Sequence, residues 1–165
     1  MKQFISHIGK AIGGISALGG AFSQVAAGLM MLLITVDVIG RQFFGRPTYV
    51  ADELSGYFLV AITFLALGQT EKLRRHLKVD IIFSWLSKKK GAWLTLICSI
   101  ISLGFIVWFT WSTAVSAKQS FDIGTHKQTG LGTPYWIPEL LLPVGLGIFA
   151  LQLIVSITQQ AKALR

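Results

Sequence analysis

The sequence predicts an all-α membrane protein with four transmembrane helices and one amphipathic interfacial helix between the second and third spans. Three observations support this fold class. Hydrophobic residues make up 53% of the 165 residues and charged residues only 13%, whereas roughly a quarter of the residues in soluble domains are charged. Four long stretches are almost free of charge, and most basic residues lie between them. Hydrocarbon rather than water is therefore the expected solvent of most side chains.

The first span is predicted at about residues 13–39. Lys10 is followed by 26 uncharged residues, 11–36, which form about 39 Å of helix, more than the ~30 Å hydrocarbon layer requires. A basic residue before an apolar run also begins a cleaved signal peptide. This run is too long for a signal core and continues into Asp37 without a convincing cleavage site, so we interpret it as a retained span.

Three further spans are predicted at about residues 52–71, 91–117 and 134–160, in a single membrane domain of residues 1–165. The second and third contain uncharged runs of 17 and 27 residues, 54–70 and 91–117. The fourth opens with Thr133 and Pro134, an N-cap followed by a first-turn proline. Pro138 and Pro143 fall inside it, and because each lacks a backbone donor we expect a kink or local unwinding near residues 139–142.

The basic residues predict the topology. Four spans place both termini and the 72–90 connection on one side of the membrane, with eleven Lys and Arg residues, against four on the other side. Because basic residues concentrate in cytoplasmic loops, both termini are expected in the cytoplasm of a bacterial cell and the chain in the inner membrane. The four outer bases are Arg41, Arg46, Lys118 and Lys127.

Residues 76–88 are predicted to form the interfacial helix. Polar residues recur at helical spacing on one face, His76, Asp80, Ser84 and Ser87, while Phe83 and its apolar neighbours form the other, with Trp85 in the same segment. Such a helix lies in the headgroup region with its bases near anionic lipids. The alternatives are a soluble loop, or a helix that packs only on protein. The spacing of His76 and Asp80 also suits two metal ligands, but two ligands are weak evidence.

Several function classes are excluded by composition. The net charge of +8 alone would suggest a nucleic-acid binder, but the bases lie between apolar runs, so no nucleic-acid partner is expected. The single cysteine, Cys98, provides no thiol pair. His76 and His126 lie outside the spans, and the chain has no phosphate-binding glycine loop or catalytic triad. We therefore expect neither an enzyme nor a bound metal or cofactor.

Charged residues cluster where the first two spans meet. Asp37 and Arg41 are four residues apart and can pair on one helix face, while Asp52 and Glu53 open the second span, where the helix dipole favours carboxylates. One interpretation is a relay for protons or ions, or an anion-recruiting patch. The other is a set of structural ion pairs, Asp37, Arg41, Asp52 and Glu53, that lock the outer hairpin. Their position at the interface favours the second.

The membrane-embedded parts of the first three spans contain hardly any ionisable residues. A protein that moves a charged solute through itself needs polar groups there to replace water, so this pattern favours an auxiliary subunit. Glu139, five residues into the fourth span, is either a coupling carboxylate or a first-turn interface residue. Small residues give the first span faces for close packing within the chain or against a partner: Gly13, Gly14, Ser16, Gly19, Gly20, Ser23 and Gly28.

The order of these features resembles a known family, the small membrane (Q) subunits of tripartite ATP-independent periplasmic (TRAP) transporters. The resemblance covers about residues 15–160. Tyr49 and Val50 depart from it, because a tryptophan is expected ahead of the glutamate. The matching positions, in order, are Arg41, Glu53, Gly68, His76, Val79, Asp80, Thr133–Pro134, Pro138 and Pro143–Val144–Gly145.

The resemblance implies partners. In that family a much larger membrane subunit carries the substrate and sodium sites and moves like an elevator, while the small subunit packs against its stationary part. A soluble periplasmic binding protein delivers the substrate, typically an organic acid. The chain is thus expected to be a scaffold subunit with sodium on the large partner, and the outer bases Arg41, Arg46, Lys118 and Lys127 are candidates for docking the binding protein. The rival interpretations are a stand-alone four-span exporter, which would need a glutamate deep in the first span, and a membrane-embedded enzyme subunit.

Overall fold

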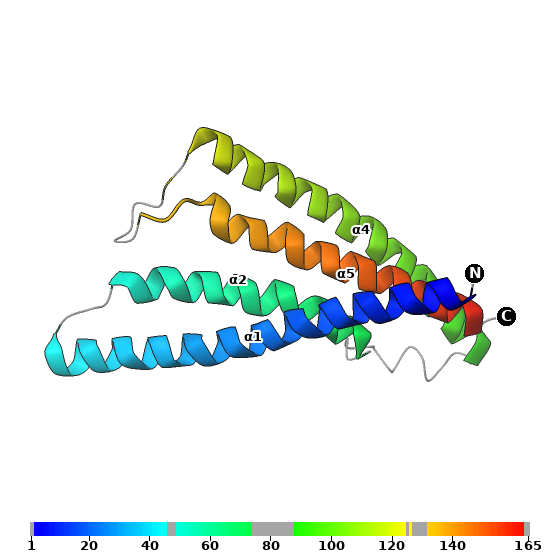
Figure 1. Cartoon of the computed structure of the whole chain (residues 1–165), viewed down its shortest axis with the longest axis horizontal. Helices are drawn as coiled ribbons and strands as arrows, with labels where there is room; N and C mark the ends of the chain where they lie inside the picture. The colour runs from blue at the N-terminus through cyan, green and yellow to red at the C-terminus, as the bar shows by residue number, and fades with distance from the viewer. Residues whose placement is uncertain (1, 46–48, 74–87, 125, 127–131, 164–165) are drawn as a thin grey trace.

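The computed structural model describes residues 2–45, 49–73, 88–124, 126 and 132–163, with side chains described from residue 9 on except at 49, 88, 89 and 163. This part of the chain forms four helices (Figure 1), namely α1 (Lys2–Phe44), α2 (Tyr49–Lys72), α4 (Lys88–Ile123) and α5 (Trp136–Ala163). All four are long and apolar enough to cross a membrane. The predicted all-α membrane fold with four spanning helices is confirmed at this level.

The helices are longer than the predicted spans at most ends. α1 begins at Lys2 and α4 continues to Ile123, well beyond the uncharged runs. α5 instead begins at Trp136, two residues after Pro134, which forms an isolated bridge with His126. The predicted interfacial helix, with His76, Asp80, Phe83 and Trp85, lies outside the described residues.

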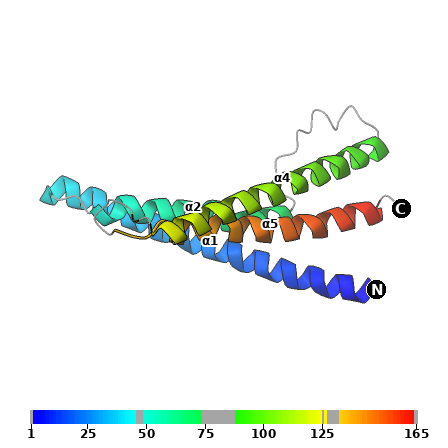
Figure 2. The same ribbon diagram turned by 90° about the horizontal axis from the view of Figure 1, so that it is seen from above.

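The four helices lie in the order α1, α2, α5, α4, with α1 and α4 at the two edges (Figure 1). α2 packs along α1 on one side and along α5 on the other, and α4 packs along α5. α1 also crosses over to touch α5 near the end where the chain begins and ends. Seen from above in Figure 2, α5 lies between α1 and α4 at that end. The arrangement is closer to a row of helices than to a closed bundle.

Glycines bring the central helices close together. A methyl group at Gly145 of α5 would lie 2.6 Å from the backbone carbonyl of Phe64 in α2, and one at Gly19 of α1 would lie 2.8 Å from the carbonyl oxygen of Leu65. Gly68 of α2 faces Ile148 of α5 and Ser16 of α1 in the same way. Dispersion between closely spaced backbones holds membrane helices together where the hydrophobic effect cannot. The row is therefore packed on both sides of α2.

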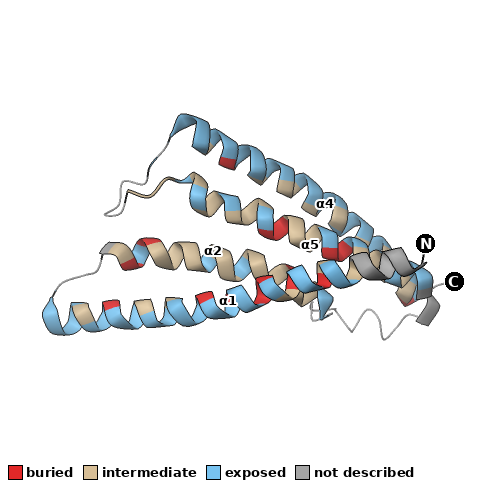
Figure 3. Ribbon diagram, in the orientation of Figure 1, coloured by how far each residue is buried: buried red, intermediate tan, exposed pale blue. Residues whose placement is uncertain are grey.

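Little of the row is buried within the chain. Figure 3 shows that buried residues concentrate where α1, α2 and α5 meet, while α1 and α4 are largely exposed. Exposed large apolar side chains cover α4 along its length, among them Trp93, Phe105, Trp108 and Trp111. Such an exterior suits hydrocarbon or other membrane helices rather than water.

The ends of the helices follow local rules. Gly45 has a φ of 62° and donates its N–H to the carbonyl of Arg41 at 3.2 Å, a left-handed cap that ends α1. Pro138 lies in the first turn of α5, where its missing N–H would have no intrahelical partner. α5 runs unbroken past Pro143. The alternative of local unwinding near these prolines is therefore wrong, whereas the kink stays a prediction.

Candidate functional site

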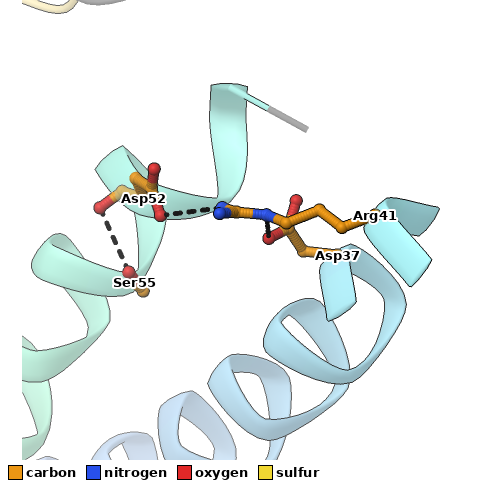
Figure 4. A network of polar contacts seen from close by, with 4 residues as sticks. All are labelled: Asp37, Arg41, Asp52 and Ser55. Atoms are coloured by element: carbon orange, nitrogen blue, oxygen red, sulfur yellow. Dashed lines mark hydrogen bonds and ion pairs between the residues drawn. The ribbon is translucent and has the colours of Figure 1, made fainter. Parts of the chain in front are cut away.

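Arg41 connects the C-terminal end of α1 to the N-terminal end of α2, as Figure 4 shows. Its Nε lies 2.6 Å from Oδ2 of Asp37, one turn earlier in α1, and its Nη2 lies 3.3 Å from Oδ1 of Asp52 in α2. The Asp37 side chain is 8% exposed, that of Arg41 48% and that of Asp52 81%. The contact with Asp37 is therefore partly shielded from water, while the contact with Asp52 is at the surface and weak.

Glu53 is next to this network but faces the other way, into the protein. It is only 1% exposed, and its carboxylate accepts a hydrogen bond from the Tyr57 hydroxyl one turn further along α2. A carboxylate held in this way costs less to bury, because hydrogen bonds replace part of its lost hydration. The four predicted ion-pair residues thus divide into an arginine shared by two aspartates and a buried glutamate that is hydrogen-bonded to a tyrosine.

A second polar cluster joins α1, α2 and α5 towards the opposite end. The Ser16 hydroxyl of α1 is fully buried and lies 3.2 Å from Oε1 of Gln152 in α5, itself 6% exposed. The same hydroxyl lies 2.9 Å from the carbonyl oxygen of Ile12, one turn back. Gln69 of α2 packs against Gly20 of α1 so closely that no side chain could replace that glycine without a shift.

Lys72 marks the end of α2 near this cluster. Its ammonium donates to the carbonyl oxygen of Gly13 in α1 at 2.8 Å. A lysine at the last turn of a helix also interacts favourably with the helix dipole. Lys72 thus fixes the level of α1 at one end of the hairpin, and Arg41 fixes it at the other.

The predicted docking residues are only partly described. Arg41 and Lys118 lie near the ends of α1 and α4 that face the same side of the row, and both are exposed. Arg46 and Lys127 lie outside the described residues. Arg41 already contacts two carboxylates of its own chain, those of Asp37 and Asp52. Lys118 lies on an exposed part of α4.

Sequence reasoning missed the polar partners in the second cluster. Gln69, Lys72 and Gln152 appear in the sequence as ordinary flanking or apolar-run residues, and their pairing across helices depends on helix rotation, which a single sequence does not give. Their only signal was their presence within or beside apolar spans, since amides there usually bond to another helix. The described chain also contains an unexpected orphan: Oε2 of Glu139 is buried and has no hydrogen-bond partner there.

The polar contacts described above hold helices against one another, and comparison with known proteins shows which family the chain belongs to. Residues 30–163 match the family described as "Tripartite ATP-independent periplasmic transporters, DctQ component". The match covers most of the chain. The chain belongs to this family. The resemblance seen in the sequence is thereby confirmed, and DctQ components are transporter subunits rather than enzymes.

Two curated relatives add detail. The "Isethionate TRAP transporter permease protein DctMQ" of Oleidesulfovibrio alaskensis is 28% identical over 113 residues, which are 67% of this chain but only 17% of the relative. The "Ectoine TRAP transporter small permease protein TeaB" of Halomonas elongata is 22% identical over 155 residues, 92% of this chain and 80% of the relative. This DctQ-type chain is thus similar to a separate small permease protein and to a small part of a much longer permease.

Family and helices together identify a multi-pass membrane protein of a TRAP transporter. The charged residues of the site lie at helix ends, and no Asp, Glu, Lys or Arg occurs between Gly13 and Val36, Leu54 and Thr70, or Gly91 and Ala117. In the part that the structure describes, no three His, Cys, Asp or Glu residues are grouped as metal ligands would be. The arrangement can hold helices together and present charge at the membrane surface.

Proposed function

We propose that this DctQ-type chain is the non-transporting scaffold subunit of a sodium-driven, binding-protein-dependent transporter for organic acids. It packs against a large membrane subunit that carries the substrate and sodium sites. The observation that supports this most is how the buried polar groups are used. The buried Ser16 and Gln152 are hydrogen-bonded to each other between helices, and the buried Glu53 accepts a hydrogen bond from Tyr57 along α2. These groups therefore serve packing instead of lining a route for solute.

The two relatives support a division of labour. One is named for isethionate and the other for ectoine. Chemically different substrates served by similar small membrane regions suggest that substrate choice lies in other parts of these transporters. For this chain, the binding protein and the large subunit are accordingly proposed to select the organic acid.

The row of helices gives the scaffold two functions. Its apolar exterior enlarges the membrane-embedded stationary part of the transporter. A larger stationary part stays in place while the transport domain moves. The basic residues on the side of the termini hold its depth by contact with anionic lipid headgroups, consistent with both termini being cytoplasmic and the membrane being the bacterial inner membrane.

The opposite surface is proposed to help dock the periplasmic binding protein. Lys118 is exposed at the end of α4 and Arg41 is half exposed at the end of α1, and the sequence adds Arg46 and Lys127. Charge reversal of Arg46 and Lys127 together is expected to slow capture of the loaded binding protein, and the difference is expected to shrink at high salt, because rim charges act mainly on association rate. Unchanged association kinetics at low salt would reject this role.

The scaffold role is tested with membrane vesicles that contain the large subunit, with and without this chain, and the loaded binding protein outside. We expect sodium-driven uptake only when both membrane subunits are present. Uptake of equal rate and sodium dependence by the large subunit alone would contradict the proposal.

A further inference from the structure

The outward face of α1 carries one polar side chain that the fold of the chain leaves unused. Four polar side chains lie between Gly13 and Asp37. The hydroxyls of Ser16, Ser23 and Thr35 each bond to a backbone carbonyl one turn earlier. The fourth, Gln24, is exposed and has no hydrogen-bond partner among the residues that the structure describes.

Gln24 lies near the middle of the membrane. Lys72 ties the level of Gly13 to one end of α2, and Arg41 ties the region of Asp37 to the other. Gln24 is 11 residues from Gly13 and 13 from Asp37, which at 1.5 Å per residue is about 16 Å and 20 Å along α1. Both distances exceed half of the ~30 Å hydrocarbon layer. The side chain is too short to reach either headgroup region.

At this depth the side-chain amide of Gln24 needs a neighbour that offers hydrogen-bonding atoms. Lipid tails offer neither donor nor acceptor, and leaving an amide without hydrogen bonds is unfavourable by about 1–3 kcal/mol in protein data. In membrane proteins glutamine side chains meet this need by bonding to another helix. The glutamines at positions 69 and 152 pack against neighbouring helices of this chain, whereas Gln24 is exposed.

The surroundings of Gln24 allow another helix to come close. Four small residues lie one turn before and after it. Gly20 is buried against Gln69 of α2, whereas the other three are exposed: Ala21, Ala27 and Gly28. A side chain at Gly28 would meet nothing within 4 Å in the chain, so internal packing does not require this glycine, although glycine in a helix is unfavourable by about 1 kcal/mol relative to alanine. Small residues beside a polar residue are typical of interfaces between membrane helices.

The relatives indicate what covers this face. In the Oleidesulfovibrio alaskensis permease, the region similar to this chain is 17% of one long polypeptide, so it lies beside the rest of a permease in a one-to-one ratio. In Halomonas elongata the similar protein is a separate small permease, which must be held to its partner without a covalent link. We propose that the face of α1 around Gln24 and Gly28 binds a transmembrane helix of the large subunit, which bears a hydrogen-bonding group at mid-membrane depth. This proposal rests on the proposed scaffold function and assigns its contact surface.

Binding is tested by co-expressing the tagged chain with the large subunit of its own transporter and measuring the association constant of the purified pair in mild detergent. Gln24→Leu is expected to lower this constant roughly 3- to 10-fold, the range found for single polar contacts between membrane helices. Gly28→Leu is expected to lower it further by blocking close approach.

The matched control is Gly104→Leu. Gly104 is a glycine of α4 that likewise has nothing within 4 Å of an added side chain, so the same substitution there tests the effect of a larger lipid-facing residue alone. Both variants gain the same helix propensity and neither position has an internal contact, so the two isolated chains are expected to have equal thermal midpoints. Equal effects of Gly28→Leu and Gly104→Leu on association would overturn the proposal.

A photo-crosslinking amino acid at position 24 identifies the occupant directly. A covalent product with the large subunit is the expected result. Products only with lipid, or only with a second copy of the chain, would overturn the assignment of this face while the purified wild-type pair still supports the scaffold function. Failure of the wild-type chain to associate with the large subunit at all would instead reject the scaffold function itself.

Discussion

Gly145 gives the most direct test of how the row is packed. A methyl group there would lie 2.6 Å from the carbonyl carbon and oxygen of Phe64 and 2.7 Å from its Cβ, whereas ordinary contact begins at 3.4 Å. The obstructing atoms are mostly backbone and cannot rotate away. To accept Gly145→Ala, α2 and α5 must therefore separate locally by about 0.8 Å. Overpacking of this kind typically lowers the free energy of unfolding by about 1–3 kcal/mol.

The control lies two residues away on the same helix. A methyl group at Gly147 meets nothing within 4 Å, so Gly147→Ala changes only helix propensity, a gain of up to about 1 kcal/mol. Both variants gain this propensity, so the difference between them isolates the helix contact. We expect it to be about 1–3 kcal/mol in favour of Gly147→Ala.

The two variants are compared by the fraction of purified protein that stays monodisperse in detergent after heating. Gly145→Ala is expected to have a midpoint several degrees below that of Gly147→Ala. Equal midpoints would refute the close approach of α2 and α5 at this position.

Three further predictions concern the polar groups. Arg41→Ala removes the ion pair of the nearly buried Asp37 and is expected to lower the free energy of unfolding by about 1–3 kcal/mol. Asp52→Asn, at the exposed end of the same network, should change it by less than about 0.5 kcal/mol in the same thermal assay. A larger loss in Asp52→Asn than in Arg41→Ala would contradict the described ion pairs. A double-mutant cycle of Ser16→Ala and Gln152→Leu should give a coupling of about 0.6 kcal/mol, and zero coupling would remove their contact from the account. Glu139→Met replaces a side chain with a buried, unpartnered oxygen, so the midpoint should stay equal or rise, and a clear fall would show that the carboxylate is held by the fold.

The number and approximate position of the membrane helices could be predicted from the sequence, because uncharged length alone determines what can cross a bilayer. The runs at 11–36, 54–70 and 91–117 are unambiguous in this respect. The ends were less accurate, since helical hydrogen bonding continues beyond the apolar run wherever nothing stops it. α1 shows both cases: it extends back to Lys2, and it ends where Gly45 adopts a left-handed conformation.

The residues of the candidate site could be predicted from the sequence, but not which of them contact one another. That Arg41 would lie near carboxylates followed from its spacing to Asp37 and from the short connection to Asp52. Which carboxylate would lie beside it, and that Glu53 would turn inward to Tyr57, depended on the rotation of α2 about its axis. A nearly uniform apolar helix gives little sequence signal for that rotation.

The small residues of α1 illustrate the same limit. The sequence showed a helix able to pack closely but not against what. In the structure Ser16, Gly19 and Gly20 face α2 and α5, whereas Gly14 and Gly28 face outward with nothing within 4 Å of an added side chain. Only this division separates the contacts within the chain from a surface available to a partner.

Solute flux through the purified chain alone tests the central claim most directly, namely that this DctQ-type protein supports a transporter without forming a pathway. The chain is reconstituted into vesicles without any other subunit, and uptake and release of organic acids are measured under a sodium gradient. The account predicts rates equal to those of empty vesicles. Sodium-dependent flux above that background would contradict it.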